Sequence, residues 1–218
     1  MDANNAITPY TLEVQQHAHR SLPAFLTLPV ELRWEIYTYL LRLLDPVNVS
    51  GHSHPTDPKV YPQIISVCRQ TYFEAHPMLY RLNIFMAHQS LLTSFPRLRQ
   101  NYSPVSSSEM ASIIRRFKLR VRLDTAPVFT REEATQAFSG LEQVDIEVWQ
   151  AEYRCAGREV LELFEDIRGV RKAKVSGSTS GFECYAKWLQ SGMMKAAGTA
   201  LGQKYEGEIG DVSAVSVF

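Results

Sequence analysis

The sequence predicts an α+β fold, with helices first and then β–α units that build a small, mostly parallel sheet. Three observations support this. Apolar residues over 28–43 recur with helical periodicity, and from residue 113 the apolar period changes from 3.6 to 2. Three alternating segments, each followed by a helical pattern, then recur at a step of 27 residues. Strands separated by helices pair in parallel, so the repeat predicts strands lying side by side.

The first helix is predicted from a proline and an apolar stripe. Pro29 stands where a first helical residue would be, a position that tolerates proline because its N–H has no intrahelical partner. Leucine or isoleucine then recurs every four residues, which places one apolar stripe along the helix. The stripe consists of Leu32, Ile36, Leu40 and Leu44.

The next part of the chain is predicted as a loop, a second helix, a strand and a short helix. Residues 47–62 are rich in Pro, Gly, Ser and His, which is typical of a loop. A helical apolar face follows over 63–76, and Pro77 is expected to break or restart that helix because proline lacks the N–H. Residues 84–88 are predicted as a strand and 89–98 as a short helix.

Strict alternation of apolar and polar residues predicts three strands in the second half. The inward residues fall at 117, 119 and 121, at 144, 146 and 148, and at 173 and 175. Thr130 and Glu133 have the capping-box spacing, which predicts a helix between the first two strands. Apolar stripes predict further helices over 157–167 and 182–195.

The outward face of these strands carries charges of alternating sign. With a constant step of 27, each row across the sheet runs positive, negative, positive, and opposite charges on neighbouring strands stabilise a sheet. Two interpretations of this charged face stay open: it is a contact surface for a partner, or a solvated face that keeps the sheet soluble. The predicted rows are Lys118–Asp145–Lys172 and Arg120–Glu147–Lys174.

These patterns divide the chain into four parts. Residues 1–24 are expected to be a flexible tail, 25–82 a helical element, 83–195 a β–α repeat domain, and 196–218 a second tail.

Composition narrows the function classes. Lys and Arg number 23, as do Asp and Glu, so no global field favours nucleic acid or an anionic membrane as a partner. No apolar run approaches a membrane span and the first residues lack a signal-peptide pattern, so an intracellular location, cytoplasmic or nuclear, is expected. Three widely spaced cysteines, Cys68, Cys155 and Cys184, are expected to be small buried residues in a reducing compartment.

No catalytic centre is predicted. The loop Gly177–Gly181 has Thr179 where a nucleophile elbow needs serine, and the glycine-rich phosphate-binding motifs do not occur. Two HxH pairs, at 17 and 19 and at 52 and 54, lack the further ligands that a metal site requires. The chain is therefore expected to be a non-enzymatic binding protein without catalytic residues, cofactor or metal.

The N-terminal part resembles an F-box. The residues that carry the resemblance form three blocks in order: Leu-Pro-x-Glu-Leu-Arg-x-x-Ile-Tyr from Leu28, Val-Cys-Arg-Gln-x-Tyr-x-Glu-Ala from Val67, and Leu-Tyr-Arg-x-Asn-x-Phe from Leu79. The blocks look like those of the F-box-like proteins that are abundant in filamentous fungi. The resemblance covers residues 25–88, about 30% of the chain.

The resemblance implies a partner and a role. F-box domains bind the Skp-type adaptor of cullin-based ubiquitin ligases, and a following domain, often of leucine-rich β–α repeats, holds the substrate. The chain would then be a substrate receptor with an unknown client. The alternative is a stand-alone scaffold or effector-like domain that does not bind the adaptor. By resemblance, the adaptor contacts would be Leu28, Pro29, Leu32, Ile36 and Leu40.

Overall fold

A computed structural model describes residues 23–43, 60–151, 157–199 and 205. Most of the two predicted tails, the two HxH pairs, Cys155 and Leu44 lie outside the described residues.

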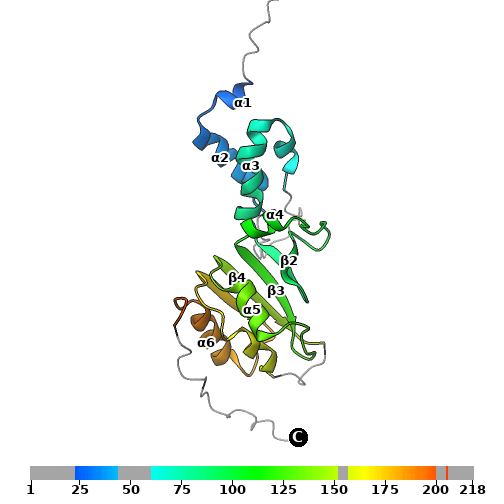
Figure 1. The fold of residues 1–218 in the computed structure, drawn as a ribbon, viewed down its shortest axis with the longest axis vertical. Coiled ribbons are helices and arrows are strands. Elements are labelled where there is room, and N and C mark those ends of the chain that lie inside the picture. Colours follow the sequence, from blue (N-terminus) through cyan, green and yellow to red (C-terminus); the bar gives the residue numbers. More distant parts are fainter. Residues whose placement is uncertain (1–22, 44–59, 152–156, 200–204, 206–218) are drawn as a thin grey trace, which may run out of the picture.

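The fold is mixed α/β, compatible with the predicted α+β class, and is built on a five-stranded, mostly parallel sheet (Figure 1). The strand order is β2-β1-β3-β4-β5. The pair β1–β2 is antiparallel, and every other neighbouring pair is parallel. The strands are β1 (Phe85–His88), β2 (Leu92–Arg97), β3 (Arg116–Arg122), β4 (Gln143–Trp149) and β5 (Lys172–Gly177).

Some helices precede the first strand in the chain, and the others follow or connect the strands. The α-helices are α1 (Ala24–Thr27), α2 (Val30–Leu41), α3 (Arg69–Leu82), α4 (Ser108–Ile113), α5 (Arg131–Phe138) and α6 (Glu183–Met193). There are also two short 3₁₀ helices in segments for which the sequence predicts longer helices. They are η1 (Pro62–Ser66) and η2 (Glu159–Phe164).

The larger core lies between one face of the sheet and the helices α5, η2 and α6 (Figure 1). Phe117, Phe138 and Phe164 are at most 1% exposed and form a chain of ring contacts, with centroids 6.3 and 6.5 Å apart. The predicted capping box of α5 is present, because the Thr130 hydroxyl accepts from the Glu133 N–H and the Glu133 carboxylate from the Thr130 N–H. The inward residues predicted for the three β–α units are therefore largely confirmed.

A second, smaller core lies between α2 and α3, at one end of the sheet (Figure 1). Asn83 joins it to the start of β1. The Asn83 side-chain amide donates to the carbonyls of Leu41 and Leu79, both at 2.7 Å, and accepts from the Leu43 N–H at 2.6 Å. One buried side chain thus fixes the end of α2 against the end of α3.

The predicted register is confirmed for one strand pair and wrong for the next. Phe117 pairs with Val144, a step of 27, but Val144 pairs with Ala173, a step of 29. A step of 27 would place Arg171 beside Val144 on the core face, where burying its charge is costly. The observed shift instead leaves the Arg171 side chain 80% exposed. Because the shift is two residues, every side chain within β5 keeps its predicted face.

The short helix predicted over 89–98 is wrong, since this segment forms the edge strand β2 in a hairpin with β1. Leu91 and Phe95, expected inward, are 51% and 48% exposed, whereas Leu92 is buried. Pro96 is the signal that favours the strand, because proline disrupts a helix interior but is tolerated on a sheet edge.

The second helix also differs from its prediction. It begins at Arg69, after η1, and runs through Pro77 to Leu82 without a break. The side chains of Cys68 and Thr71 form the capping interaction that sets this start. The expectation of buried cysteines is wrong for Cys184, which is exposed, and Cys68 is only half-buried.

Candidate partner-binding site

The inward stripe of α2 differs by one residue from the predicted stripe. Its buried side chains are Arg33, Tyr37 and Leu41, which face α3. The predicted residues therefore lie beside this seam. Leu32 is 47% exposed, and Ile36 and Leu40 are half-buried. Sequence periodicity could not detect the shift, because it follows apolar residues and Arg33 is charged.

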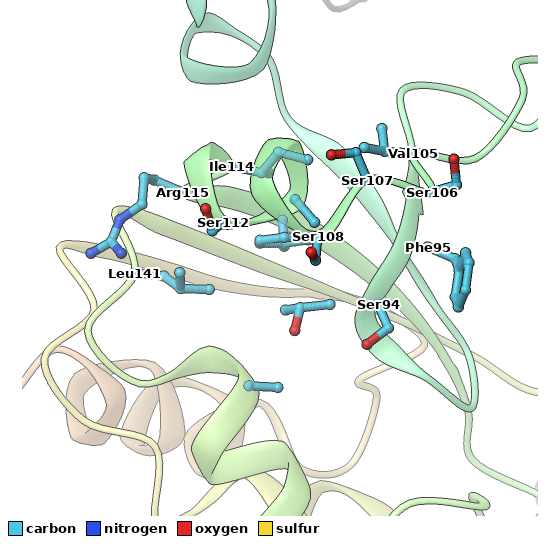
Figure 2. A pocket seen from close by; sticks show the side chains of 14 residues that line it. Ser94, Phe95, Val105, Ser106, Ser107, Ser108, Ser112, Ile114, Arg115 and Leu141 are labelled. Carbon is cyan, nitrogen blue, oxygen red and sulfur yellow. The ribbon is translucent and has the colours of Figure 1, made fainter.

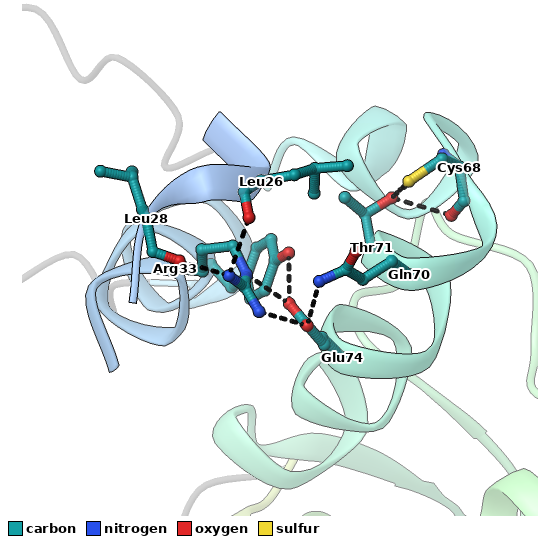
Figure 3. Close-up of polar contacts among 8 residues, drawn as sticks. Leu26, Leu28, Arg33, Cys68, Gln70, Thr71 and Glu74 are labelled. Atoms are coloured by element: carbon teal, nitrogen blue, oxygen red, sulfur yellow. Dashed lines mark hydrogen bonds and ion pairs between the residues drawn. The ribbon is translucent and has the colours of Figure 1, made fainter. Parts of the chain in front are cut away.

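The turn before α2 is held by the guanidinium of Arg33 (Figure 3). Arg33 Nη1 donates to the carbonyl of Leu28 and, at 3.4 Å, to that of Leu26. Pro29 is exposed and occupies the N-cap position, so α2 begins one residue later than predicted, and Leu28 is half-buried. The two predicted contact residues at the start of the helix are thus presented by a turn whose carbonyl groups are fixed from inside.

Arg33 also joins α2 to α3 through Glu74. Its Nε and Nη2 lie 2.9 and 2.6 Å from the two carboxylate oxygens, and the Tyr37 hydroxyl donates to the same carboxylate at 2.9 Å. The hydrogen bond from Arg33 lowers the pKa of Glu74 to about 2, against the opposing effect of burial. Burial and the Glu74 hydrogen bond raise the pKa of Tyr37 to about 12. The carboxylate is therefore charged at neutral pH and holds the two helices together.

Large apolar side chains are exposed around this helical pair. Trp34 and Tyr39 project from α2, at 50% and 79% exposure, and Phe73 from α3 at 73%. Val67, between η1 and α3, is 67% exposed. Contiguous exposed apolar residues mark interaction sites in many proteins. Sequence reasoning did not select Trp34, Tyr39 or Phe73, because none continues the four-residue apolar step of the predicted stripe. Val67 was expected on the inward face of the second helix, and that expectation is wrong.

The second predicted surface is the charged sheet face, defined as the outward side chains of β3, β4 and β5. Among the described residues, no helix covers this face, and the side chains of Lys118 and Arg120 are 44% and 40% exposed. Glu147 lies between them, with its Oε2 2.8 Å from Lys118 Nζ and 3.8 Å from Arg120 Nε. The pairing is diagonal for Lys118, since its direct neighbour on β4 is Asp145.

The predicted charge rows are confirmed between β3 and β4 and wrong between β4 and β5. Lys174, not Lys172, is the neighbour of Asp145, and Lys172 lies beside Gln143. The cause is the two-residue register shift described above. All six predicted residues still lie on the same face, with Ser176 rather than Lys174 beside Glu147.

Asp145 is the carboxylate at the centre of this face. Its Oδ2 accepts from the Gln143 side chain at 2.8 Å, while its buried Oδ1 has no hydrogen-bond partner among the described residues. Burial raises the pKa of Asp145, and the nearby Lys172, Lys174 and Lys118 oppose that rise. The charged sheet face therefore contains a carboxylate that its own lysines do not fully compensate.

Trp149 closes the charged sheet face at the end of β4. The guanidinium of Arg120 lies 6.0 Å and that of Arg122 5.3 Å from its ring centroid, and its buried indole N–H has no acceptor among the described residues. Cation–π contacts of this kind hold arginine side chains in place at exposed sites. The alternation of apolar and polar residues in β4 continues to residue 149, and this pattern could have placed Trp149 on the predicted sheet face.

A pocket of about 410 Å³ lies between β2, α4 and α5 (Figure 2). Its lining includes the apolar residues Ile114, Phe117 and Leu141 and the serines of the loop before α4. The Arg115 guanidinium at its rim donates to the Gly140 carbonyl at 2.7 Å. Among the described residues that line this pocket, none is a histidine, a cysteine or an acid.

Comparisons with known proteins assign no family: no protein-family model, curated protein or solved structure significantly matches the chain. Across the part of the chain that the structure describes, no helix has the length and apolar character needed to cross a bilayer. Within the same residues, no three His, Cys, Asp or Glu side chains gather closely enough to hold a metal ion.

Proposed function

We propose that this chain is a non-enzymatic protein-interaction module that serves as an F-box-type substrate receptor of a cullin-based ubiquitin ligase. The α1–α3 element binds a Skp-type adaptor, in the manner of the F-box-like proteins of filamentous fungi. The sheet region acts as an irregular, leucine-rich-repeat-like part that holds the client. The mechanism is proximity, since both partners are bound by one chain.

The observation that carries this proposal is the position of the apolar stripe on α2. The α2–α3 pair buries its own core through Tyr37, Leu41 and Ala75, which are 0% exposed. Leu32 and Ile36 belong neither to this core nor to the larger core on the sheet, among the described residues. An apolar stripe left beside a self-contained helical pair is suited to helix-in-groove contacts with another protein.

The test is retention of the full chain on an immobilised Skp-type adaptor. Leu32→Asp and Ile36→Asp place a charge in the proposed contact, and each is expected to abolish retention. Val128→Asp is the matched control, because Val128 is 80% exposed and lies in the sheet region. It is expected to bind like the wild type. Circular dichroism of each variant verifies that the helices are intact.

A wild-type chain that is not retained would refute the ligase role and leave the scaffold or effector-like alternative. Equal retention of the wild type and both α2 variants would place the adaptor contact elsewhere. The exposed ring of Phe73 on α3 would then be the next surface to substitute.

A further inference from the structure

We infer that the charged sheet face binds an acidic polypeptide segment. Its carboxylates are bound by two columns of basic side chains, one on β3 and one on β5. The inference rests on the proposed function only in taking this face as the client-holding surface. As a binding property of the chain, it does not require the adaptor.

The first argument is that the face is open. Parallel sheets occur almost only with both faces covered. Here α5, η2 and α6 cover one face, and no described helix covers the other. The strands nevertheless carry half-exposed side chains on that second face, as at Lys118 and Arg120. Within the described residues, this face therefore has room for an added polypeptide layer.

The second argument is charge. The chain as a whole has no net charge, but the charged sheet face is basic. Lys172 and Lys174 on β5 are exposed, and neither forms an ion pair with another described residue. On β3, Lys118 and Arg120 share the single carboxylate of Glu147. Both edges of the face therefore offer positive charge to a partner.

The third argument is spacing. The columns on β3 and β5 are separated by β4, so they lie two interstrand steps, or about 9.6 Å, apart. A helix with its side chains is about 10–12 Å across. One acidic helix laid along β4 can therefore direct carboxylates to Lys118 on one side and to Lys174 on the other. Paired charges of this kind favour encounter and orientation.

The acids of β4 argue for a polypeptide rather than a nucleic acid. Asp145 and Glu147 lie between the two basic columns, where a phosphate backbone following β4 would meet negative charge. The one aromatic ring of the face, Trp149, is already contacted by the guanidiniums of Arg120 and Arg122. Binding of single strands relies on a uniformly basic groove with free stacking surfaces.

The experiment measures fluorescence anisotropy of a labelled, glutamate-rich helical peptide titrated with the full chain at low salt. Binding is expected, and it weakens as the ionic strength rises because salt screens exposed charges. The double variant Lys172→Glu/Lys174→Glu is expected to weaken binding by at least about tenfold. Lys172→Gln/Lys174→Gln, a milder change to the fold, is expected to give an intermediate loss.

The matched control is Lys187→Glu/Lys195→Glu, which changes the net charge equally on the opposite, helix-covered side. Lys187 and Lys195 are exposed, on α6 and just after it, and this variant is expected to bind like the wild type. Absence of peptide binding, equal loss in both double variants, or tighter binding of a dT20 oligonucleotide than of the peptide would each overturn the inference. Adaptor retention is measured separately, and the Lys172/Lys174 variants are expected to keep it.

Discussion

Arg33 on α2 and Glu74 on α3 form a two-point ion pair, with Nη2 2.6 Å from Oε1 and Nε 2.9 Å from Oε2 (Figure 3). The two residues lie in the first and second of the three sequence blocks that resemble an F-box. The third block supplies Asn83, which bonds to the end of α2. Arg33 and Glu74 therefore join the first two blocks directly, and Asn83 fixes the end of the helix that carries Leu32 and Ile36.

Glu74→Gln is expected to destabilise the α2–α3 pair. Glutamine keeps the shape but removes the charge that accepts from Arg33 and Tyr37, and hydrogen bonds to charged groups are the stronger ones. The expected fall in Tm at pH 7 is about 3–6 °C, or roughly 1.5 kcal/mol for a chain of this size. Thermal unfolding followed by circular dichroism measures it.

The same pair predicts a pH dependence. The folded pKa of Glu74, about 2, is below its usual value of 4.5, so its stabilisation is present above about pH 4.5 and is lost as the pH falls toward 2. The Tm difference between wild type and Glu74→Gln should therefore shrink over this range. Glu35→Gln, at an exposed position of α2, is the control and should change Tm little at any pH. A Glu74→Gln difference that stays constant down to pH 2 would contradict the assigned role.

Gly177→Ala is expected to be one of the most damaging small substitutions. Gly177 ends β5 with φ of +105°, and an added Cβ would lie 2.1 Å from the Val148 carbonyl oxygen. Strand backbone must move to relieve this clash, so a loss above about 2 kcal/mol is expected. Gly181→Ala is the matched control, because Gly181 also has positive φ, +92°, but a Cβ added there would have no heavy atom within 4 Å.

Conformational strain alone costs about 1–2 kcal/mol. Denaturant unfolding of both variants therefore separates strain, which both share, from the clash, which only Gly177→Ala has. Equal losses in the two would show that β5 does not approach Val148 as closely as the structure has it.

The local sequence pattern was sufficient to predict most strands of the sheet. It was insufficient where contacts between residues distant in sequence determine the strand register. The alternation around Phe117 and Val144 predicts both the strands and their inward faces, because burial on one side imposes a period of two. The step to β5 was not predictable, since it depends on excluding Arg171 from the core and on the close approach at Gly177. These constraints exist only once the strands are side by side.

The same limit applies to the candidate site. Periodicity places Leu32 and Ile36 on an apolar stripe, and the structure leaves them beside the inner seam and not within it. Arg33 occupies the inward position because Glu74, 41 residues later, compensates its charge. No local signal connects two positions so far apart, so the seam was predicted one residue away from where it lies.

Removing the charge of Asp145 and removing that of Glu147 are expected to change Tm in opposite directions, although both are acids on β4. Burial raises the folded pKa of Asp145, so ionisation opposes folding at pH 7, and Asp145→Asn should raise Tm by about 1–3 °C. The gain should disappear as the pH falls below the usual aspartate pKa, where the wild-type side chain is already neutral.

Glu147 is the matched counterpart for that test. The hydrogen bond from Lys118 lowers the pKa of Glu147, so its stabilisation is present above the usual glutamate pKa and is lost as the pH falls through the lowered value. Glu147→Gln should therefore lower Tm at pH 7, while Asp145→Asn raises it. Thermal unfolding from pH 7 to pH 3 measures both variants. If Asp145→Asn also lowers Tm at pH 7, the lysines around Asp145 compensate its charge more than its burial opposes it.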